Sequence, residues 1–263
     1  MKIGIYGLGE AGSLFAADLQ QGSFDDEIHA FDPAPVTTPT GIIRHDDPVA
    51  VAANADLVFG VTAASDARTA LLQGLDSLPE HAIYADFASS APALKHELAQ
   101  LAADRQRRFC DVALMAIVPG NGIKAPALVA GSGSDSFADI MKSRGMPIEA
   151  ISATAGDAAE RKLLRSVTMK GLAAVLTESL RAAEVAGCSE WVWQNLCHQF
   201  TAMDATTLER LVEGTGVHAA RRLHEMQDTR AMLDALGIEP VMTAATVTSL
   251  EQVLQHGIPQ VPQ

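Results

Sequence analysis

The chain has few cysteines and lacks a long apolar stretch. Only three of its 263 residues are cysteine, Cys110, Cys188 and Cys197, and no two of them have the spacing of a metal-binding or redox pair. No apolar run approaches the ~20 residues of a membrane-spanning helix, and the first residues do not follow the pattern of a secretory signal. We therefore expect a reduced, cytoplasmic protein without disulfides, a bound metal or a membrane partner.

Positive charge is also scarce. The chain carries 19 Lys and Arg residues against 32 Asp and Glu residues, which gives a formal net charge of −13. This excess repels the phosphates of nucleic acids, so we expect no nucleic-acid partner. A local group of cations could still bind an anionic small molecule. Apolar residues make up 48% of the chain, which is enough for a packed core.

Short apolar runs alternate with alanine-rich stretches over the first 150 or so residues. Strands are predicted at Lys2–Tyr6, Glu27–Phe31, Leu57–Thr62, Ala82–Phe87, Phe109–Ala113 and Ala127–Ala130. Helices are predicted between some of them, at Ala11–Gln21, Asp66–Leu75 and Ala91–Asp104. Several of the strand runs are apolar almost throughout, which is typical of parallel strands buried on both faces. The alternation predicts an α/β fold with a Rossmann-type, doubly wound sheet.

The pattern changes near Gly156. Asp157–Ala186 contains no proline and one glycine and precedes Gly187, so it predicts one helix of about 45 Å that connects two domains. Further helices are predicted from Ser189, from Asp204, at Val217–Leu236 and at Val241–His256. We predict a dinucleotide-binding domain over 1–155 and an all-helical domain over 156–263. So few helices bury little core alone, which favours a homodimer.

A glycine motif follows the first predicted strand. Its spacing is Gly-x-Gly-x-x-Gly, in the segment Gly7-Leu8-Gly9-Glu10-Ala11-Gly12. In such a motif the first glycine allows a tight turn, the second lets a pyrophosphate approach the backbone, and the third lets helix and strand pack closely. The start of the following helix offers N–H groups and partial positive charge to phosphates. The alternative is a plain tight turn without a ligand.

An acidic residue ends the second predicted strand. Asp32 stands 20 residues after Gly12, where a carboxylate can accept hydrogen bonds from an adenosine ribose and repel a 2′-phosphate. We therefore expect NAD as the cofactor in preference to NADP. The alternative for Asp32 is a turn residue before Pro33. Thr62 and Ala63 follow the next strand and are expected to border the cofactor.

With these residues, the first half resembles the β-hydroxyacid dehydrogenases, the superfamily of 3-hydroxyisobutyrate dehydrogenase and 6-phosphogluconate dehydrogenase. The second half is similar to a short branch of 6-phosphogluconate dehydrogenase-like oxidoreductases with an uncharacterised helical domain. The segments that carry this likeness are "GDAAERKLLRSVTMKGL" and "HAARRLHEMQDTRAMLDALGIEPVMT". Together the two resemblances span nearly the whole chain.

The resemblance implies a catalytic lysine. Lys162 has the family's distance from Gly156 and would transfer the proton, but the family's asparagine four residues later is replaced by Ser166. The family's Ser-Gly-Gly segment, which binds a substrate carboxylate, is replaced by Met115-Ala116-Ile117. On a helix, Lys170 shares a face with Lys162 and Ser166, so we include it among the catalytic candidates.

Two serines complete the predicted site. Ser89 and Ser90 follow the fourth predicted strand, at the strand end where ligands bind in open α/β sheets. With Met115 they are the expected substrate-binding residues; the alternative for the serines is helix capping before Pro92. A charged helix face such as that of Lys162 can also be an ordinary solvated surface.

We expect an NAD(P)-dependent oxidoreductase that transfers hydride between nicotinamide and a small hydroxy acid or a related alcohol or carbonyl. Lys162 would act as general acid and base. One alternative is an imine reductase of the same architecture, in which the position of Lys162 need not be basic. Another is a non-catalytic NAD(H)-binding protein, because fold alone does not establish activity.

Overall fold

The computed structural model describes residues 1–262. The chain forms two compact units, Met1–Arg165 and Ser166–Gln263, and each is described here by itself. The division falls inside helix α6 (Asp157–Val185), so this one helix contributes residues to both units.

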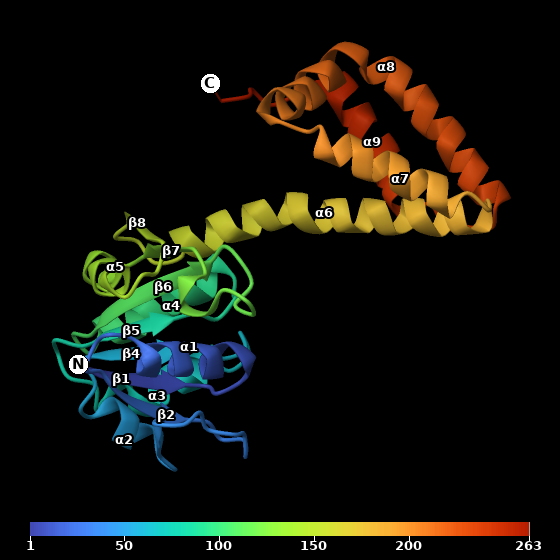
Figure 1. The fold of residues 1–263 in the computed structure, drawn as a ribbon. Coiled ribbons are helices and arrows are strands. Elements are labelled where there is room, and N and C mark those ends of the chain that lie inside the picture. Colours follow the sequence, from blue (N-terminus) through green and yellow to red (C-terminus); the bar gives the residue numbers. More distant parts are fainter. Residues whose placement is uncertain (263) are drawn as a thin grey trace. The chain divides into compact units, whose positions relative to one another are not determined.

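The first unit contains an eight-stranded sheet (Figure 1). Its strands are β1 (Lys2–Tyr6), β2 (Glu27–Phe31), β3 (Ile43–Arg44), β4 (Leu57–Gly60), β5 (Ile83–Asp86), β6 (Arg108–Leu114), β7 (Ala127–Ala130) and β8 (Ile148–Ser152). Their order in the sheet is β3-β2-β1-β4-β5-β6-β7-β8. Neighbouring strands are parallel except at β6–β7. The order reverses between β1 and β4, which is the switch point of a doubly wound sheet.

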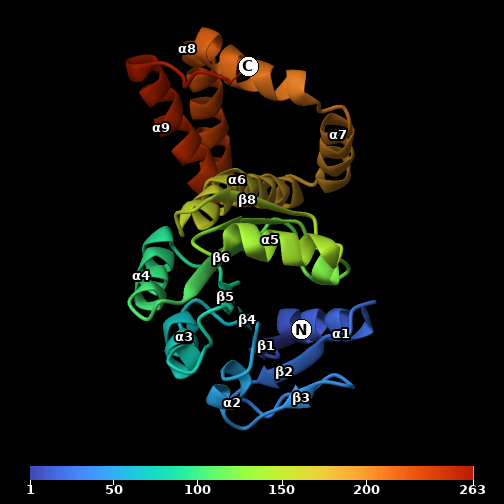
Figure 2. The same cartoon turned by 90° about the vertical axis from the view of Figure 1, so that its left-hand side faces the viewer.

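Helices cover both faces of this sheet (Figure 2). On one face lie α1 (Glu10–Gln21) and α5 (Ser134–Ser143); on the other lie α2 (Pro48–Ala52), α3 (Ala67–Leu75) and α4 (Pro92–Ala103). Successive strand side chains point to opposite faces. Ile5 therefore joins the core under α1, and Tyr6 joins the core that contains Leu71 of α3. This arrangement confirms the predicted Rossmann-type fold.

The strand predictions differ from the structure mainly at the edges of the sheet. β1, β2 and β7 have the predicted bounds, and β4, β5 and β6 differ by one or two residues at their ends. The edge strands β3, of two residues, and β8, of five, were not predicted. The antiparallel β7 was also unexpected: β6 and β7 are joined by the 3₁₀ turn η1 (Gly122–Lys124), and no helix crosses the sheet to bring the chain back in parallel.

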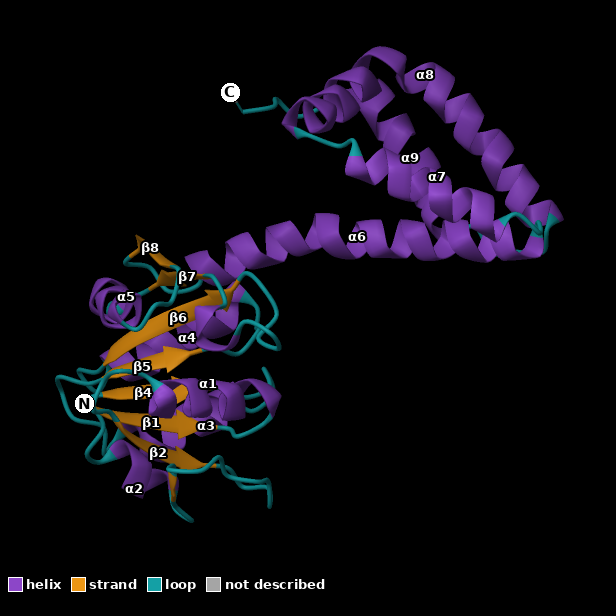
Figure 3. Ribbon diagram, in the orientation of Figure 1, coloured by secondary structure: helices purple, strands orange, loops and turns teal. Residues whose placement is uncertain are grey.

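The described part of the second unit is helical (Figure 3). It contains the end of α6, then α7 (Ser189–Thr201), α8 (Ala205–Ala235) and α9 (Val241–His256). The two helices predicted between Asp204 and Leu236 form one helix, α8, with a kink at His218 (φ −113°, ψ 17°). Asp204 caps α8, because its carboxylate accepts a hydrogen bond from the amide of Thr207 at 2.8 Å. Among residues 1–262, no helix is both long and apolar enough to cross a bilayer.

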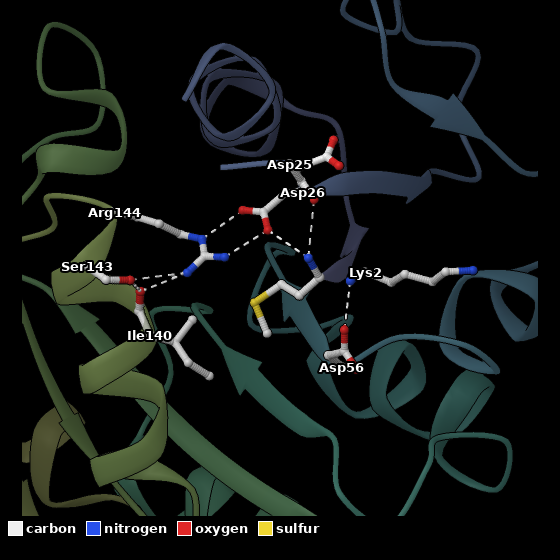
Figure 4. A network of polar contacts seen from close by, with 8 residues as sticks. Lys2, Asp25, Asp26, Asp56, Ile140, Ser143 and Arg144 are labelled. Atoms are coloured by element: carbon white, nitrogen blue, oxygen red, sulfur yellow. Dashed lines mark hydrogen bonds and ion pairs between the residues drawn. The ribbon is translucent and has the colours of Figure 1, made fainter. Parts of the chain in front are cut away.

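A polar network joins segments at the amino ends of the strands (Figure 4). Arg144, which follows α5, donates two hydrogen bonds of 2.8 Å to the carboxylate of Asp26, just before β2. The amino group of Met1 lies 3.0 Å from the same carboxylate. Burial opposes ionisation of Asp26, but the hydrogen bonds from Arg144 and Met1 outweigh it, so the pKa of Asp26 is lowered. Charged pairs therefore hold together the segments at the amino ends of the strands.

Candidate active site

Two of the three motif glycines are required by packing. Gly7 turns the chain after β1 with a φ of +96°, and a Cβ atom there would lie 2.2 Å from the carbonyl oxygen of Val61. A Cβ atom on Gly12, in the first turn of α1, would lie 1.9 Å from the carbonyl oxygen of Gly7. The strand, the turn and the helix therefore pack too closely for any side chain at these two positions.

Gly9 has no such requirement. Its φ is −62°, which any residue can adopt, and a Cβ atom built on it meets no atom within 4 Å. Gly9 is the N-cap of α1, so it lies beside N–H groups that have no partner within the helix. The missing side chain leaves open space against the positive end of a helix, which is where a phosphate group binds.

Asp32 lies immediately after β2 and is connected to the glycine turn. Its carboxylate accepts a hydrogen bond of 2.7 Å from the amide of Leu8 and one of 2.8 Å from the amide of Ala34. Asp32 also lines a cavity of about 360 Å³ together with Gly7 and Gly9. The carboxylate is thus held by two backbone amides at the edge of a cavity, an arrangement suited to binding hydroxyl groups.

A second cavity of about 360 Å³ adjoins the first. Both are lined by Gly9, Val61, Thr62 and Ala63. The second extends past Glu10, Ala11, Gly12, Phe87, Ser89 and Leu114. The hydroxyl oxygen of Thr62 is buried without a hydrogen-bond partner among the described residues, as expected of a group that awaits a ligand. The two cavities lie at the carboxyl ends of β2, β1, β4 and β5, across the switch point.

The first turns of α6 place a lysine near the carboxyl end of β5. The Nζ atom of Lys162 donates a hydrogen bond of 2.7 Å to the Oγ atom of Ser89, which follows β5 and lines the second cavity. Arg165 donates a hydrogen bond of 2.9 Å to the carbonyl oxygen of Met115, which follows β6. The structure therefore brings together Lys162 and Ser89, two residues predicted for the site from segments 73 positions apart.

Other predicted site residues are placed differently. Ser90 is buried and lines neither cavity, and its hydroxyl has no hydrogen-bond partner among the described residues. Leu8 is buried and contributes its backbone amide, which bonds Asp32. Ser166 and Lys170 lie on the part of α6 that belongs to the second unit.

A buried ionic group, which was not predicted from the sequence, joins α4, β5 and β6. Lys95 on α4 is 1% exposed, and its Nζ atom lies 2.8 Å from a carboxylate oxygen of Asp86 and 3.1 Å from one of Asp111. The other oxygen of Asp111 accepts hydrogen bonds from the amides of Gly156 and Ala159, at the start of α6. Burial raises the pKa of Asp86 although Lys95 opposes this effect.

This group joins the two segments that carry Ser89 and Lys162. Asp86 ends β5 three residues before Ser89, and Asp111 holds the helix on which Lys162 lies. The available sequence signal was an acidic residue within each of two apolar strand runs, because such residues are rarely buried without a partner. Across residues 1–262, no set of three or more His, Cys, Asp or Glu side chains is placed to hold a metal ion.

Two comparisons with known sequences found similar proteins. A family model described as a domain of unknown function, DUF1932, matches residues 183–253. A curated relative, an uncharacterized 28.5 kDa protein of Methanothermus fervidus, is 24% identical over 171 residues, which are 65% of this chain and 66% of the relative. The match therefore spans slightly less than two thirds of that relative's length.

Two solved structures resemble the whole chain. An imine reductase from Myxococcus stipitatus in complex with NADP⁺ has a TM-score of 0.82 at 14% identity, covering 98% of this chain and 95% of the other. A conserved protein of unknown function, MTH1747, described as similar in structure to 3-hydroxyacid dehydrogenases, has a TM-score of 0.61 at 23% identity, covering 97% of both chains. At these identities the likeness establishes the fold. The fold shared with these two structures is the one described above, a Rossmann-type unit followed by a helical C-terminal unit.

Proposed function

We propose that this protein is an NAD-dependent oxidoreductase that transfers hydride between nicotinamide and a small hydroxy acid or a related alcohol or carbonyl compound. The observation that carries the proposal is Gly9. Neither backbone conformation nor protein packing requires glycine at this position, and Gly9 lines both cavities. A ligand lying against the start of α1 accounts for the missing side chain.

The residues around the two cavities fit such a dinucleotide. The start of α1 at Gly9 would bind the phosphates, and Asp32 would accept hydrogen bonds from the adenosine ribose. The unpartnered hydroxyl of Thr62 would donate a hydrogen bond where the cavities meet. Asp32 and Asp66 are the charged residues that line the first cavity, and none of its described lining residues is Lys, Arg or His. This lining opposes a 2′-phosphate and favours NAD, whereas the imine reductase named above was solved with NADP⁺.

The proton chemistry is assigned to Lys162. When bound, nicotinamide supplies hydride transfer, and the chain's own residues move the proton. Lys162 would accept the hydroxyl proton during oxidation and return it during reduction. Its hydrogen-bond partner Ser89 lines the second cavity, which supports this assignment. We retain Ser166 and Lys170 as further proposed catalytic residues, and Ser89, Ser90 and Met115 as the proposed substrate-binding residues.

Cofactor binding to the Gly9→Val variant tests the proposal. The enhanced fluorescence of bound NADH gives Kd, and Gly9→Val should raise it at least tenfold while Tm stays near the wild-type value. Gly12→Ala is the matched control, because its Cβ atom would meet backbone at 1.9 Å and should lower Tm. Wild-type protein that fails to bind NADH, or a Gly9→Val variant that binds as tightly as wild type, would refute the proposal.

Imine reduction is the second candidate, because two departures from the resembled family weaken the case for a standard hydroxy acid substrate. Met115-Ala116-Ile117 replaces the segment expected to bind a substrate carboxylate, and Ser166 replaces an asparagine. The Lys162→Ala variant distinguishes the two reactions, with NADH formation from NAD⁺ followed on hydroxy acids and NADH consumption followed on carbonyls and cyclic imines. Loss of alcohol oxidation by several orders of magnitude supports dehydrogenase chemistry. Retained imine reduction supports the reductase, and tight NADH binding without turnover on any compound supports a non-catalytic binding protein.

We further propose a homodimer in a reducing compartment such as the cytoplasm. The second unit exposes large apolar side chains, including Trp191 (68% exposed) and Val217 (77% exposed), which a second copy could cover. All three cysteines of the chain are free, which is typical of proteins in a reducing compartment.

A further inference from the structure

Arg44 on the edge strand β3 binds the loop that follows β2. Its Nη2 atom donates hydrogen bonds to the carbonyl oxygens of Asp32 at 2.9 Å and Ala34 at 2.6 Å. Its Nη1 atom donates to the carbonyl oxygen of Val36. One guanidinium group therefore satisfies three carbonyl groups of a single five-residue loop.

Without Arg44 these three carbonyl groups would have no common partner. The loop makes a backbone bond of its own, from the amide of Val36 to the carbonyl oxygen of Ala34 at 2.8 Å, but this bond does not reach Asp32. Loops with few internal bonds sample many conformations. A planar guanidinium with several fixed donors is well suited to hold such carbonyls in one arrangement.

Arg44 is itself held by the sheet. It pairs with Ala30 of β2, and the amide of the next residue, His45, bonds the carbonyl oxygen of Ala30 at 2.9 Å. The imidazole of His45 lies against that of His29, with ring nitrogens 2.8 Å apart. The guanidinium therefore extends from an anchored strand to an otherwise weakly bonded loop.

The loop begins with the residue proposed to bind the ribose. Two amides hold the carboxylate of Asp32, and one of them, that of Ala34, belongs to the loop that Arg44 binds. Arg44 does not line the cavity beside Asp32. Its guanidinium donates hydrogen bonds to the loop carbonyls and, at 3.4 Å, to the hydroxyl of Thr38. Arg44 is therefore placed to support the loop. A side chain that bound a phosphate group of the cofactor would instead face the cavity.

We propose that Arg44 is a positioning residue for cofactor specificity: it holds the Asp32 loop so that the carboxylate binds the adenosine ribose of NAD. This inference rests on the proposed function, because it presumes that an adenine dinucleotide occupies the site. A loosened loop should weaken NADH, which uses the carboxylate, more than NADPH, whose 2′-phosphate the carboxylate repels. A general loss of stability should weaken both cofactors equally.

The experiment measures Kd for NADH, NADPH and ADP-ribose in wild type, Arg44→Met and Arg44→Lys. We expect Arg44→Met to raise the Kd values of NADH and ADP-ribose about tenfold, or about 1.4 kcal/mol, and to change that of NADPH less than threefold. Arg44→Lys should recover little of this loss, because an ammonium group cannot reproduce the planar donor arrangement. Arg105→Met is the matched control, since Arg105 also bonds a backbone carbonyl, that of Leu101, but lines neither cavity.

The outcomes separate the two proposals. Wild-type protein that binds neither NADH nor ADP-ribose refutes the proposed function. Wild-type binding of NADH with unchanged Kd values in Arg44→Met refutes the role of Arg44 and leaves the proposed function intact. If Arg44→Met loses affinity for NADPH alone, the positioning role is refuted, because Arg44 would then bind the 2′-phosphate directly. Should Arg44→Met fail to fold, Arg44→Lys provides the same comparison, and an NADH:NADPH ratio of Kd values equal to that of wild type refutes the inference.

Discussion

Removing the buried cation at Lys95 should strongly destabilise the first unit. Lys95 is 1% exposed, and the two carboxylates that it contacts, those of Asp86 and Asp111, are 0% exposed. The substitution Lys95→Met fills a similar volume but leaves both carboxylates without a counter-charge. Removal of one partner from a buried ion pair costs about 3–5 kcal/mol. Because whole domains are stable by only about 5–15 kcal/mol, this is a large fraction of the total.

The aromatic residues allow the two units to be followed separately. The chain's two tyrosines, Tyr6 and Tyr84, lie in β1 and β5 of the first unit, and its two tryptophans, Trp191 and Trp193, lie in α7 of the second. Urea unfolding, monitored by the near-ultraviolet circular dichroism of tyrosine, should show the lower stability of the first unit in Lys95→Met. Tryptophan fluorescence reports the unfolding of the second unit. Lys142→Met, at an exposed position on α5, is the control and should change stability by less than about 0.5 kcal/mol.

The stability lost in Lys95→Met should depend on pH and on the carboxylates of Asp86 and Asp111. The pKa of Asp86 is already raised by burial, and without Lys95 it should rise further. A carboxyl group with a raised pKa in the folded state destabilises folding as pH rises through that pKa, and the penalty disappears below its ordinary value. The deficit of Lys95→Met should therefore shrink as pH falls toward about 4. Adding Asp86→Asn and Asp111→Asn should restore much of the stability at pH 7. A loss below about 1 kcal/mol at pH 7 for Lys95→Met would refute the reasoning, since it would mean that the pair contributes no more than a surface ion pair.

Two further predictions concern the second unit. Burial opposes ionisation of Glu178, but its carboxylate accepts hydrogen bonds from the hydroxyl of Thr243 and from the amides of Met242 and Thr243 at the start of α9, so its pKa is lowered. Its stabilisation should be present above the ordinary pKa of glutamate and lost as pH falls through the lowered value. Glu178→Ala should cost about 1 kcal/mol at pH 7, and tryptophan-detected unfolding that shows no difference from wild type at pH 7 would contradict this. The substitution Trp193→Glu should convert the proposed dimer into monomers, as measured by light scattering after gel filtration, and an unchanged mass would count against α7 as part of the dimer interface.

Patterns of short range determined much of the fold. Apolar runs and glycine stops located β1, β2, β7 and α9 at their observed bounds, because strand and helix periodicity is set by neighbouring residues. The glycine motif and Asp32 also follow from spacing, since a strand, a tight turn and a helix must succeed one another in that order. Edge strand β3 was not predicted because two residues are too few to show an alternating pattern. The antiparallel direction of β7 was not predicted because it depends on a β6–β7 connection that contains no crossover helix.

The candidate site was also predicted only in part from the sequence. The types of its residues were visible in the chain: glycines at a turn, an acid after a strand, a lysine early in a long helix. That Lys162 meets Ser89, that Lys95 lies between Asp86 and Asp111, and that Arg44 binds the Asp32 loop were decided by tertiary structure alone. These contacts join residues that are far apart in the sequence. They form only when the folded sheet brings the ends of its strands and its buried charges together.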